Sequence, residues 1–483
     1  MDFKKEYLEK VHNATVNVLQ NTGMRFLHPR AIEIFKKHGI RVDGETVYFT
    51  EDQLMYWVKK APSSFRVYAR NPKYNITVGG DNVNILTGSG PAHVSDYDGN
   101  IRVATSGDEI RLIKLYEQNP DINSNGGGIV QAQDVDKRHR ITTIGFTGLL
   151  YTEKVLEIES VEDASAGYKD GEEYIELIKM AYDLSNEDLL REPRCIAITD
   201  TNSPLMFDKK MLEMIFFCAE YGQVLCISAC SMAGTTAPVT LAGNIVLTNA
   251  EVLAGIALSQ MVREGAPVAY GCQSTAADMG TAGIAIGAPE GALTYALGAA
   301  MARYYGIPSR GGGGLTDSSG ITAQAGYESM ITFMSTYGSH TNLIEQSSGI
   351  MGSYATFSEE KLMLDFEIIG FTKRYFEGVS FDDEDIAADV IKEIGIGGNY
   401  LTHEHTLENM REQLYFPTIS KRNVKGNDAE RVFRAGIYNR IDRMLESYKR
   451  PDFEPSRIAA MKRYLVSIGV NETLLTKIEK DAF

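Results

Sequence analysis

The stretch VLCISACSMAGTTAPVTLAGNIVLTNAEVLAGIALSQMVREGAPVAYGC, residues 224–272, holds two short apolar runs separated by a long helical segment. Residues 224–229 and 267–272 have the length and continuous apolar character of buried strands. Residues 249–264 between them have the length of a helix. A strand, a helix and a second strand in this order predict a parallel βαβ unit.

The same alternation extends from about residue 84 to residue 375. The expected strands are residues 84–88, 122–131, 154–158, 194–199, 224–229, 267–272, 307–313 and 342–346. The expected helices are residues 108–118, 135–150, 172–184, 208–221, 249–264, 290–305, 323–338 and 359–376. Eight such units predict an α/β fold of the TIM (β/α)8 barrel type. A doubly wound open sheet is the alternative, but its Gly-x-Gly-x-x-Gly turn is not found in the right context, and LTGSGPAH at 86–93 is a fragment of it.

The alternation divides the chain into three parts. Residues 1–80 are expected to form a small N-terminal α/β cap, with a hairpin turn at Asp43-Gly44. Residues 81–376 are expected to form the barrel. Residues 377–483 are charged and mostly helical in pattern, which predicts a C-terminal helical extension.

Composition is that of an ordinary globular protein, with 43% apolar and 23% charged residues. A net charge of −16 argues against general affinity for nucleic acid or anionic membranes. No stretch approaches the ~20 continuous apolar residues of a membrane span, and the N-terminal residues lack a signal-peptide pattern. The five cysteines are an odd number in apolar surroundings, which indicates reduced thiols in a cytoplasmic protein.

In a parallel barrel, binding and catalytic groups lie at the carboxyl ends of the strands. Here those ends are followed by Gly, Ser, Thr, Asn and Gln with few charges, as in NGGGIVQAQ (125–133), GCQSTAADMGTAG (271–283) and RGGGGLTDSSG (310–320). This pattern predicts a wide, polar and nearly uncharged bowl that suits a bulky partner. The alternative is that small residues merely permit tight turns.

Metal and covalent chemistry have little support in the residue pattern. No His-x-x-x-His helix pair, Gly-x-Ser-x-Gly elbow or complete P-loop occurs, and lysines are scarce at the strand ends. A thiolate zinc site on Cys226, Cys230 and Cys272 is an alternative to their role as small buried residues. We therefore expect no metal site.

Several stretches resemble the trimethylamine methyltransferase family. The most specific is MAGTTAPVTLAGNIVLTNAEVLAGIALSQMVREGAPVAYGCQS (232–274), and shorter ones are HGIRVDGETVYF (38–49), APSSFRVYARNP (61–72), SDYDGNIRVATSGDEIRL (95–112), RGGGGLTDSSGITAQAGYESM (310–330) and GIGGNYLTHEHT (395–406). The resemblance spans nearly the whole chain and implies a TIM barrel. Founding members of the family contain pyrrolysine, whose site would fall near residues 345–351, and this sequence has none.

Members without pyrrolysine resemble glycine betaine methyltransferase and related enzymes for other quaternary amines, such as proline betaine, carnitine and γ-butyrobetaine. The resemblance implies transfer of an N-methyl group to the Co(I) of a separate corrinoid protein. A quaternary ammonium is already an activated methyl donor, and the amine leaves neutral without needing a proton. Because the Asp-x-His-x-x-Gly corrinoid-binding loop is absent from this chain, we expect no tightly bound cofactor of its own. We also expect a homo-oligomer.

The candidate site residues follow from these two arguments together. Aromatic faces hold quaternary ammonium groups, and Arg310 with the amides of residues 311–314 can hold a carboxylate. The substrate-binding candidates are Tyr97, Gln131, Gln273, Arg310, Tyr327, Tyr354, Phe357, Tyr400, His403 and His405, and the catalytic candidates are Asp317, Glu345 and Gln346. For each aromatic ring the alternative is ordinary packing, and for the two histidines it is a subunit contact.

Two other functions remain open at this stage. One is a methyltransferase that moves methyl groups between methylcorrinoid and tetrahydrofolate, which would bind a pterin and consume no betaine. The other is a non-catalytic quaternary-amine binding protein, which would methylate no corrinoid.

Overall fold

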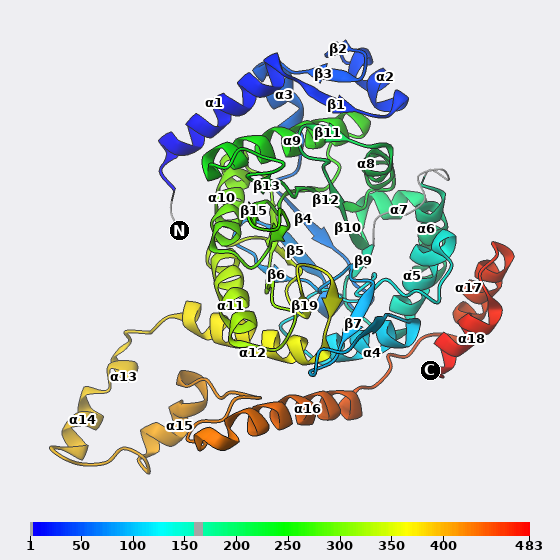
Figure 1. The fold of residues 1–483 in the computed structure, drawn as a ribbon. Coiled ribbons are helices and arrows are strands. Elements are labelled where there is room, and N and C mark those ends of the chain that lie inside the picture. The colour runs from blue at the N-terminus through cyan, green and yellow to red at the C-terminus, as the bar shows by residue number, and fades with distance from the viewer. Residues whose placement is uncertain (1–2, 159–167) are drawn as a thin grey trace.

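A seven-stranded, all-parallel sheet forms the centre of the molecule (Figure 1). The computed structural model describes residues 3–158 and 168–483. In sheet order the strands are β6 Asn84–Ile85, β18 Leu343–Glu345, β17 Ser309–Gly312, β14 Val268–Cys272, β12 Val224–Ala229, β10 Cys195–Asp200 and β9 Leu156–Ile158. These are seven of the eight expected strands, each shorter than or equal to the expected range.

The eighth expected strand, 122–131, forms bridges and not a regular strand. Ile122 makes a parallel bridge to Ile85 in β6, and Ser124 makes one to Val155 beside β9. Residues 122–125 therefore lie between the two edge strands of the sheet. Gly126, Gly127 and Gly128 follow with positive φ, a conformation that ends extended pairing.

All eight expected helices are present and surround the sheet (Figure 1). They are α4 Ser106–Glu117, α5 Arg140–Tyr151, α6 Lys169–Tyr182, α8 Lys209–Tyr221, α9 Leu241–Val262, α10 Pro289–Tyr305, α11 Ala323–Gly338 and α12 Glu359–Glu377. α9 begins at Leu241 and not at residue 249, because Asn244 donates a side-chain hydrogen bond to the Thr275 carbonyl and so fits inside the buried helix.

One helix in the described part of the chain, α9, is long and apolar enough to cross a membrane, with a mean hydropathy of 1.5. Its apolar window is 89% buried inside the fold, packed against α1, α3, α8, α10 and strands of the sheet. It is a core helix of this fold.

The N-terminal residues divide between two sides of the body formed by the central sheet and its helices. α1 Lys5–Asn21 and α3 Glu51–Val58 pack on α9, and β1 Met24–Phe26 pairs in parallel with β11 Met206–Phe207. α2 Pro29–Lys37 and the hairpin β2 Arg41–Asp43 with β3 Thr46–Tyr48 complete this layer.

A second N-terminal hairpin, β4 Ser64–Val67 with β5 Ile76–Gly79, has a different place. Val67 and Val78 pack in a separate apolar cluster with Ile196, Val224 and Leu343 from the starts of the strands. The hairpin therefore covers the amino-terminal ends of the strands of the central sheet.

Two small sheets lie over the carboxyl ends of the strands. One joins β13 Met232–Ala233, β15 Thr275–Ala277 and β16 Ile284–Ala285, and the other joins β19 Ile350–Met351, β20 Thr356–Phe357, β7 His93–Ser95 and β8 Ile101–Val103. They are built from loops that the sequence pattern left without structure.

The C-terminal residues form helices along one side of the body. α16 Ala429–Ser447 packs on α12 and α4, while α17 Pro455–Ser467 and α18 Glu472–Lys480 pack near α5 and α6. Between α12 and α16, the short helices α13 Asp383–Ile386, α14 Ala388–Ile394 and α15 Glu404–Gln413 project away from the body (Figure 1).

Candidate active site

A buried arginine lies at the carboxyl end of the sheet. Arg310 on β17 is 2% exposed, and its Nε donates to Glu345 Oε2 at 2.7 Å, at the end of β18. Its Nη1 donates to Gln273 Oε1 at 2.5 Å and lies 3.4 Å from Ser228 Oγ at the end of β12. Side chains from β18, from β12 and from the residue after β14 thus converge on the guanidinium of Arg310.

Small residues at the strand ends make room for these side chains. A Cβ added at Gly312 would lie 2.7 Å from Gln273 Nε2, and one at Gly271 would lie 2.6 Å from Ser228 Cβ. At these two positions the small residues accommodate the polar group around Arg310.

Two further carboxyl groups face the same interior. Burial raises the pKa of Asp200 at the end of β10, while the Arg310 charge opposes the rise. Burial also raises the pKa of Glu157 on β9 to about 7, with a contribution from Glu345. Glu157 accepts hydrogen bonds from Thr87 Oγ1 at 2.6 Å and Ser124 Oγ at 2.5 Å.

Arg310 carries the positive charge of this group. Burial alone would lower its pKa, but Glu345 and Asp200 more than reverse this and raise it. Glu345 is its ion-pair partner, while burial raises the pKa of Asp200 and Glu157 and so favours their protonated forms. A bound cation would favour the ionised forms of these two carboxyl groups and would be stabilised by them.

The loop between β18 and β20 covers this group. Gln273 Nε2 donates to Tyr354 Oη at 2.5 Å, so the Tyr354 phenol and Arg310 share Gln273 as a hydrogen-bond partner. Gln346, Ser353 and Tyr354 all have positive φ, at 54°, 54° and 72°. Left-handed backbone is unfavourable for such residues and gathers at functional sites.

The other two catalytic candidates hold this loop and its neighbours in place. Gln346 Oε1 accepts from the Ser89 amide, and its Nε2 donates to Ser89 Oγ, both at 3.1 Å. Asp317 accepts from the amides of Ile286 and Gly287 at 3.0 Å and from Ser353 Oγ at 2.6 Å. Both side chains therefore fasten loops at the mouth.

The remaining aromatic candidates lie apart from Arg310. Tyr327 is 63% exposed and lines a cavity of about 750 Å³ together with Asp317 and Glu328. Phe357 is fully buried with its ring 6.4 Å from that of Tyr116. Tyr97, in the turn between β7 and β8, lies under the Arg434 guanidinium at 4.5 Å.

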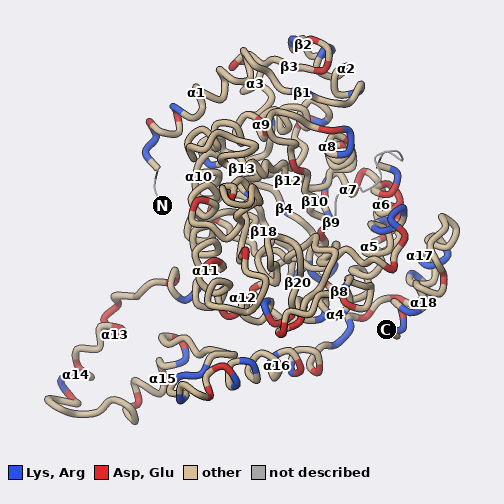
Figure 2. The backbone as a smooth tube through the Cα atoms, viewed as in Figure 1, with Lys and Arg blue, Asp and Glu red and all other residues tan. Residues whose placement is uncertain are grey.

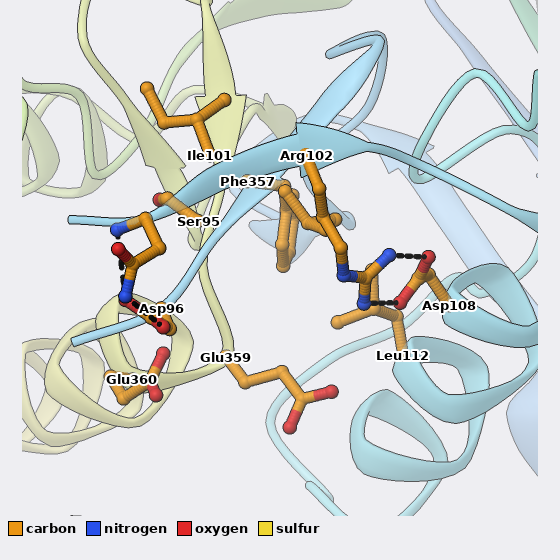
Figure 3. A pocket seen from close by; sticks show the side chains of 11 residues that line it. Ser95, Asp96, Ile101, Arg102, Asp108, Leu112, Phe357, Glu359 and Glu360 are labelled. Atoms are coloured by element: carbon orange, nitrogen blue, oxygen red, sulfur yellow. Dashed lines mark hydrogen bonds and ion pairs between the residues drawn. The ribbon is translucent and has the colours of Figure 1, made fainter. Parts of the chain in front are cut away.

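Phe357 also lines a second cavity, of about 290 Å³, next to the β7–β8 hairpin. Figure 3 shows Glu359 and Glu360 on one side of it and the Arg102–Asp108 ion pair on the other. None of the groups around Arg310 lines this cavity.

Four further residues complete the predicted set, namely Gln131, Tyr400, His403 and His405. Gln131 joins a loop through its backbone amide, which donates to the Pro91 carbonyl at 2.9 Å. Tyr400, His403 and His405 lie on the projecting segment, where His403 Nε2 is 3.5 Å from Glu393 Oε1. The structure therefore brings together Arg310, Gln273, Glu345 and Tyr354, and it separates these three tail residues from them.

Asp200 and Glu157 were not among the predicted site residues, although the sequence around each of them indicates a buried polar position. Asp200 is the last residue of an apolar strand run, CIAITD, at the end where barrel sites form. Glu157 is a lone acid inside the apolar run VLEI. A charge within a buried strand is costly without partners and therefore marks a polar interior.

Among residues 3–158 and 168–483, no three His, Cys, Asp or Glu side chains are grouped so as to hold a metal ion. Burial raises the pKa of Cys230 and of Cys272 to about 12, and it raises that of Cys226 well above the usual range of a thiol. These three side chains are therefore protonated thiols in this interior.

Comparison with known proteins gives consistent matches along the chain. The family model described as trimethylamine methyltransferase (MTTB) matches residues 2–467. Glycine betaine methyltransferase of Desulfitobacterium hafniense (strain Y51) is 33% identical over 468 residues, which cover 96% of each chain. Trimethylamine methyltransferase MttB of D. hafniense (strain DSM 10664 / DCB-2) is 30% identical, covering 96% of this chain and 93% of that protein. Proline betaine:corrinoid methyltransferase of Eubacterium limosum is 30% identical, covering 95% and 96%.

Proposed function

Because this chain belongs to the trimethylamine methyltransferase family, we propose that it transfers an N-methyl group from a quaternary amine to the Co(I) of a corrinoid on a separate protein. Relatives named for glycine betaine and for proline betaine support this substrate class. The corrinoid is the methyl acceptor, and the chain itself carries no tightly bound cofactor.

The observation that carries the proposal is the Arg310 group. A betaine has a permanent positive charge on nitrogen and a carboxylate a few bonds away. A bound ammonium favours the ionised forms of Asp200 and Glu157, whose pKa burial raises, and is stabilised by the carboxylates that result. Nε and Nη1 of Arg310 are engaged by protein groups, so we assign its Nη2 to the substrate carboxylate. Trimethylamine has no carboxylate to meet this arginine.

The residues of the site position the methyl group and exclude water. The departing amine is neutral, so no side chain has to donate a proton. Gln273 holds Arg310 and the Tyr354 hydroxyl in one arrangement, and the Tyr354 ring is the aromatic face that we assign to the ammonium. Glu345, Gln346 and Asp317 act as positioning residues for Arg310 and for the covering loop.

The proposal includes the wider architecture. Residues 122–125 complete a closed eight-stranded barrel through their bridges to β6 and β9. The chain divides into a cap of residues 1–80, a barrel of residues 81–376 and an extension of residues 377–483. We further propose that the protein is cytoplasmic and self-associates.

The test is a substrate panel with reduced cobalamin, in which cobalt methylation is followed by absorbance. Betaines should methylate cobalt faster than trimethylamine at equal concentration. Arg310→Gln should slow the reaction with betaines by about 100-fold, and Tyr327→Phe, at the separate cavity, should change it by less than about twofold.

Three results would contradict the proposal. Faster methylation from trimethylamine would remove the substrate assignment. Methyl exchange with tetrahydrofolate without betaine consumption would indicate the folate-linked reaction. Betaine binding without cobalt methylation, with a corrinoid protein present, would indicate a binding protein.

A further inference from the structure

The segment between α12 and α16 exposes an unusual amount of apolar surface. We call residues 378–417 the arm. Nine of its apolar side chains are more than half exposed, namely Val379, Phe381, Ile386, Ile391, Ile396, Leu401, Leu407, Leu414 and Phe416. Exposed apolar side chains in this number on one segment indicate an interaction site on a folded protein.

The helices of the arm are short, and their exposed apolar side chains lack the packing that stabilises short helices. α13, α14 and α15 have 4, 7 and 10 residues. Helices below ~12–15 residues are marginal in water and are stabilised by packing of an apolar face. Two polar contacts join the helices of the arm to one another. Gln413 Nε2 donates to Asp385 Oδ1 at 3.1 Å, and His403 pairs with Glu393. These polar contacts leave the apolar side chains uncovered.

Charge is divided unevenly along the arm and the residues that follow it. Residues 381–393, the acidic limb, hold six carboxylates and one lysine: Asp382, Asp383, Glu384, Asp385, Asp389, Glu393 and Lys392. Residues 414–427, the basic segment, hold Lys421, Arg422 and Lys425 and no acid. Figure 2 shows the red acidic limb at α13 and α14, and blue positions near the start of α16. In the described chain no ion pair joins the acidic limb to the basic segment.

A two-fold contact between two copies of the chain can pair the acidic limb of each copy with the basic segment of the other. In a two-fold contact, a patch on the first copy meets a second patch on its partner, and the reverse contact follows by symmetry. An acidic limb and a basic segment on one chain are complementary in this way. The apolar side chains between them supply the water-free centre that interfaces between identical chains have.

We propose that a second copy of this chain covers the arm, in a two-fold contact that places each acidic limb on the partner's basic segment. The arm leaves the body sideways from the end of α12 (Figure 1), away from the strand ends where the methyl acceptor must approach. The contact therefore leaves the barrel mouth accessible.

The first experiment measures the mass of the full chain in solution by sedimentation velocity. The parent should have at least twice the 53.3 kDa of one chain. Phe381→Asp combined with Ile396→Asp and Leu401→Asp should raise the dissociation constant by about 30-fold or more. Tyr7→Asp with Tyr56→Asp, on exposed cap residues, is the matched control and should leave the mass unchanged. Circular dichroism checks that each variant stays folded.

The second experiment exchanges charge between the two patches. One variant carries Asp382→Lys, Asp383→Lys and Asp389→Lys, and the other carries Lys421→Glu, Arg422→Glu and Lys425→Glu. Each alone should dissociate, because like charges then meet across the axis. An equimolar mixture should form a mixed dimer, because each reversed patch meets an opposite charge.

A parent that is monomeric at micromolar concentration would overturn the proposal. So would arm variants that keep the parent's mass, or a mixture that stays monomeric. None of these readouts depends on methyl transfer, so failure here is distinguishable from failure of the proposed reaction.

Discussion

Arg310 neutralises buried carboxyl groups at the carboxyl end of the central sheet. Its guanidinium is the counter-charge for Glu345 and Asp200, both of which lie in a desolvated interior. Removing one partner of a buried ion pair leaves an uncompensated charge and costs about 3–5 kcal/mol. We expect Arg310→Met to lower the free energy of unfolding by this amount.

A double variant at Arg310 and Glu345 distinguishes the loss of a buried charge partner from the loss of side-chain packing. Arg310→Met with Glu345→Gln removes both members of the pair, so its free energy of unfolding should exceed that of Arg310→Met by about 1–2 kcal/mol. Urea denaturation of the parent, both single variants and the double variant completes the cycle. Additive losses would show that the two side chains do not act as a pair.

Glu157 gives the interior a pH dependence. Burial and Glu345 raise the pKa of this carboxyl to about 7, whereas a glutamate in the unfolded chain titrates near 4.3. Between these values the folded chain holds a proton that the unfolded chain has lost. The contribution of Glu157 to the free energy of unfolding therefore falls as pH rises through this window and levels off above about pH 7.

Glu157→Gln removes that titration. Relative to the parent, its free energy of unfolding should increase by about 2 kcal/mol between about pH 5.5 and pH 8. Glu446→Gln, at an exposed position on α16, is the control and should show no such change. Equal pH dependence of the parent and Glu157→Gln would contradict the assignment.

At the residue scale, the sequence identified side chains at the ends of strands more readily than elsewhere. Arg310, Gln273 and Glu345 could be predicted because a strand's last residues have a defined direction in a barrel. Tyr97 and Tyr400 could not be placed, because a hairpin turn and a projecting segment take positions that depend on contacts distant in sequence. The polar partners of Arg310 emerged only with the strand register.

At the element scale, helix α10 lies unusually close to strand β14. A Cβ added at Gly298 would lie 2.4 Å from Cys272 Cβ, which real structures do not tolerate without movement. We expect Gly298→Ala to lower the free energy of unfolding by about 1–3 kcal/mol, as overpacking does.

Gly326 on α11 is the matched control, because nothing lies within 4 Å of an added Cβ there. Gly326→Ala should raise the free energy of unfolding by about 0.5–1 kcal/mol through helix propensity alone. Thermal and urea unfolding of both variants give the comparison. Equal effects would show that the helix–strand approach is not tight.

The long elements were predictable because each buries an apolar run of its own. All eight helices and seven strands lie near their expected positions for this reason. Two-residue strands such as β13 and β19 carry no periodic signal, since their pairing is decided by loops that meet over the barrel. The β4–β5 hairpin falls within the expected cap of residues 1–80, but its place depends on packing against the starts of the sheet strands, which are distant in sequence.

At the scale of the whole molecule, we expect the purified chain to catalyse methyl transfer without a bound, light-absorbing cofactor. The sequence lacks an Asp-x-His-x-x-Gly loop, and the proposed acceptor arrives on a separate protein. The purified chain should therefore show no corrinoid absorbance and keep its methyl-transfer rate after exhaustive chelation. Stoichiometric cobalamin in the isolated chain, or zinc whose removal abolishes activity, would contradict this.

The β4–β5 hairpin fills the space at the amino-terminal ends of the strands, and this limits the order of events in the proposed reaction. Because Val67 and Val78 occupy that end, we expect the amine and the acceptor to use the same opening at the carboxyl ends of the strands. The amine has to enter before the acceptor protein arrives, and the demethylated product waits until that protein leaves. Turnover then follows a compulsory sequence, and an excess of acceptor slows the enzyme when amine is scarce.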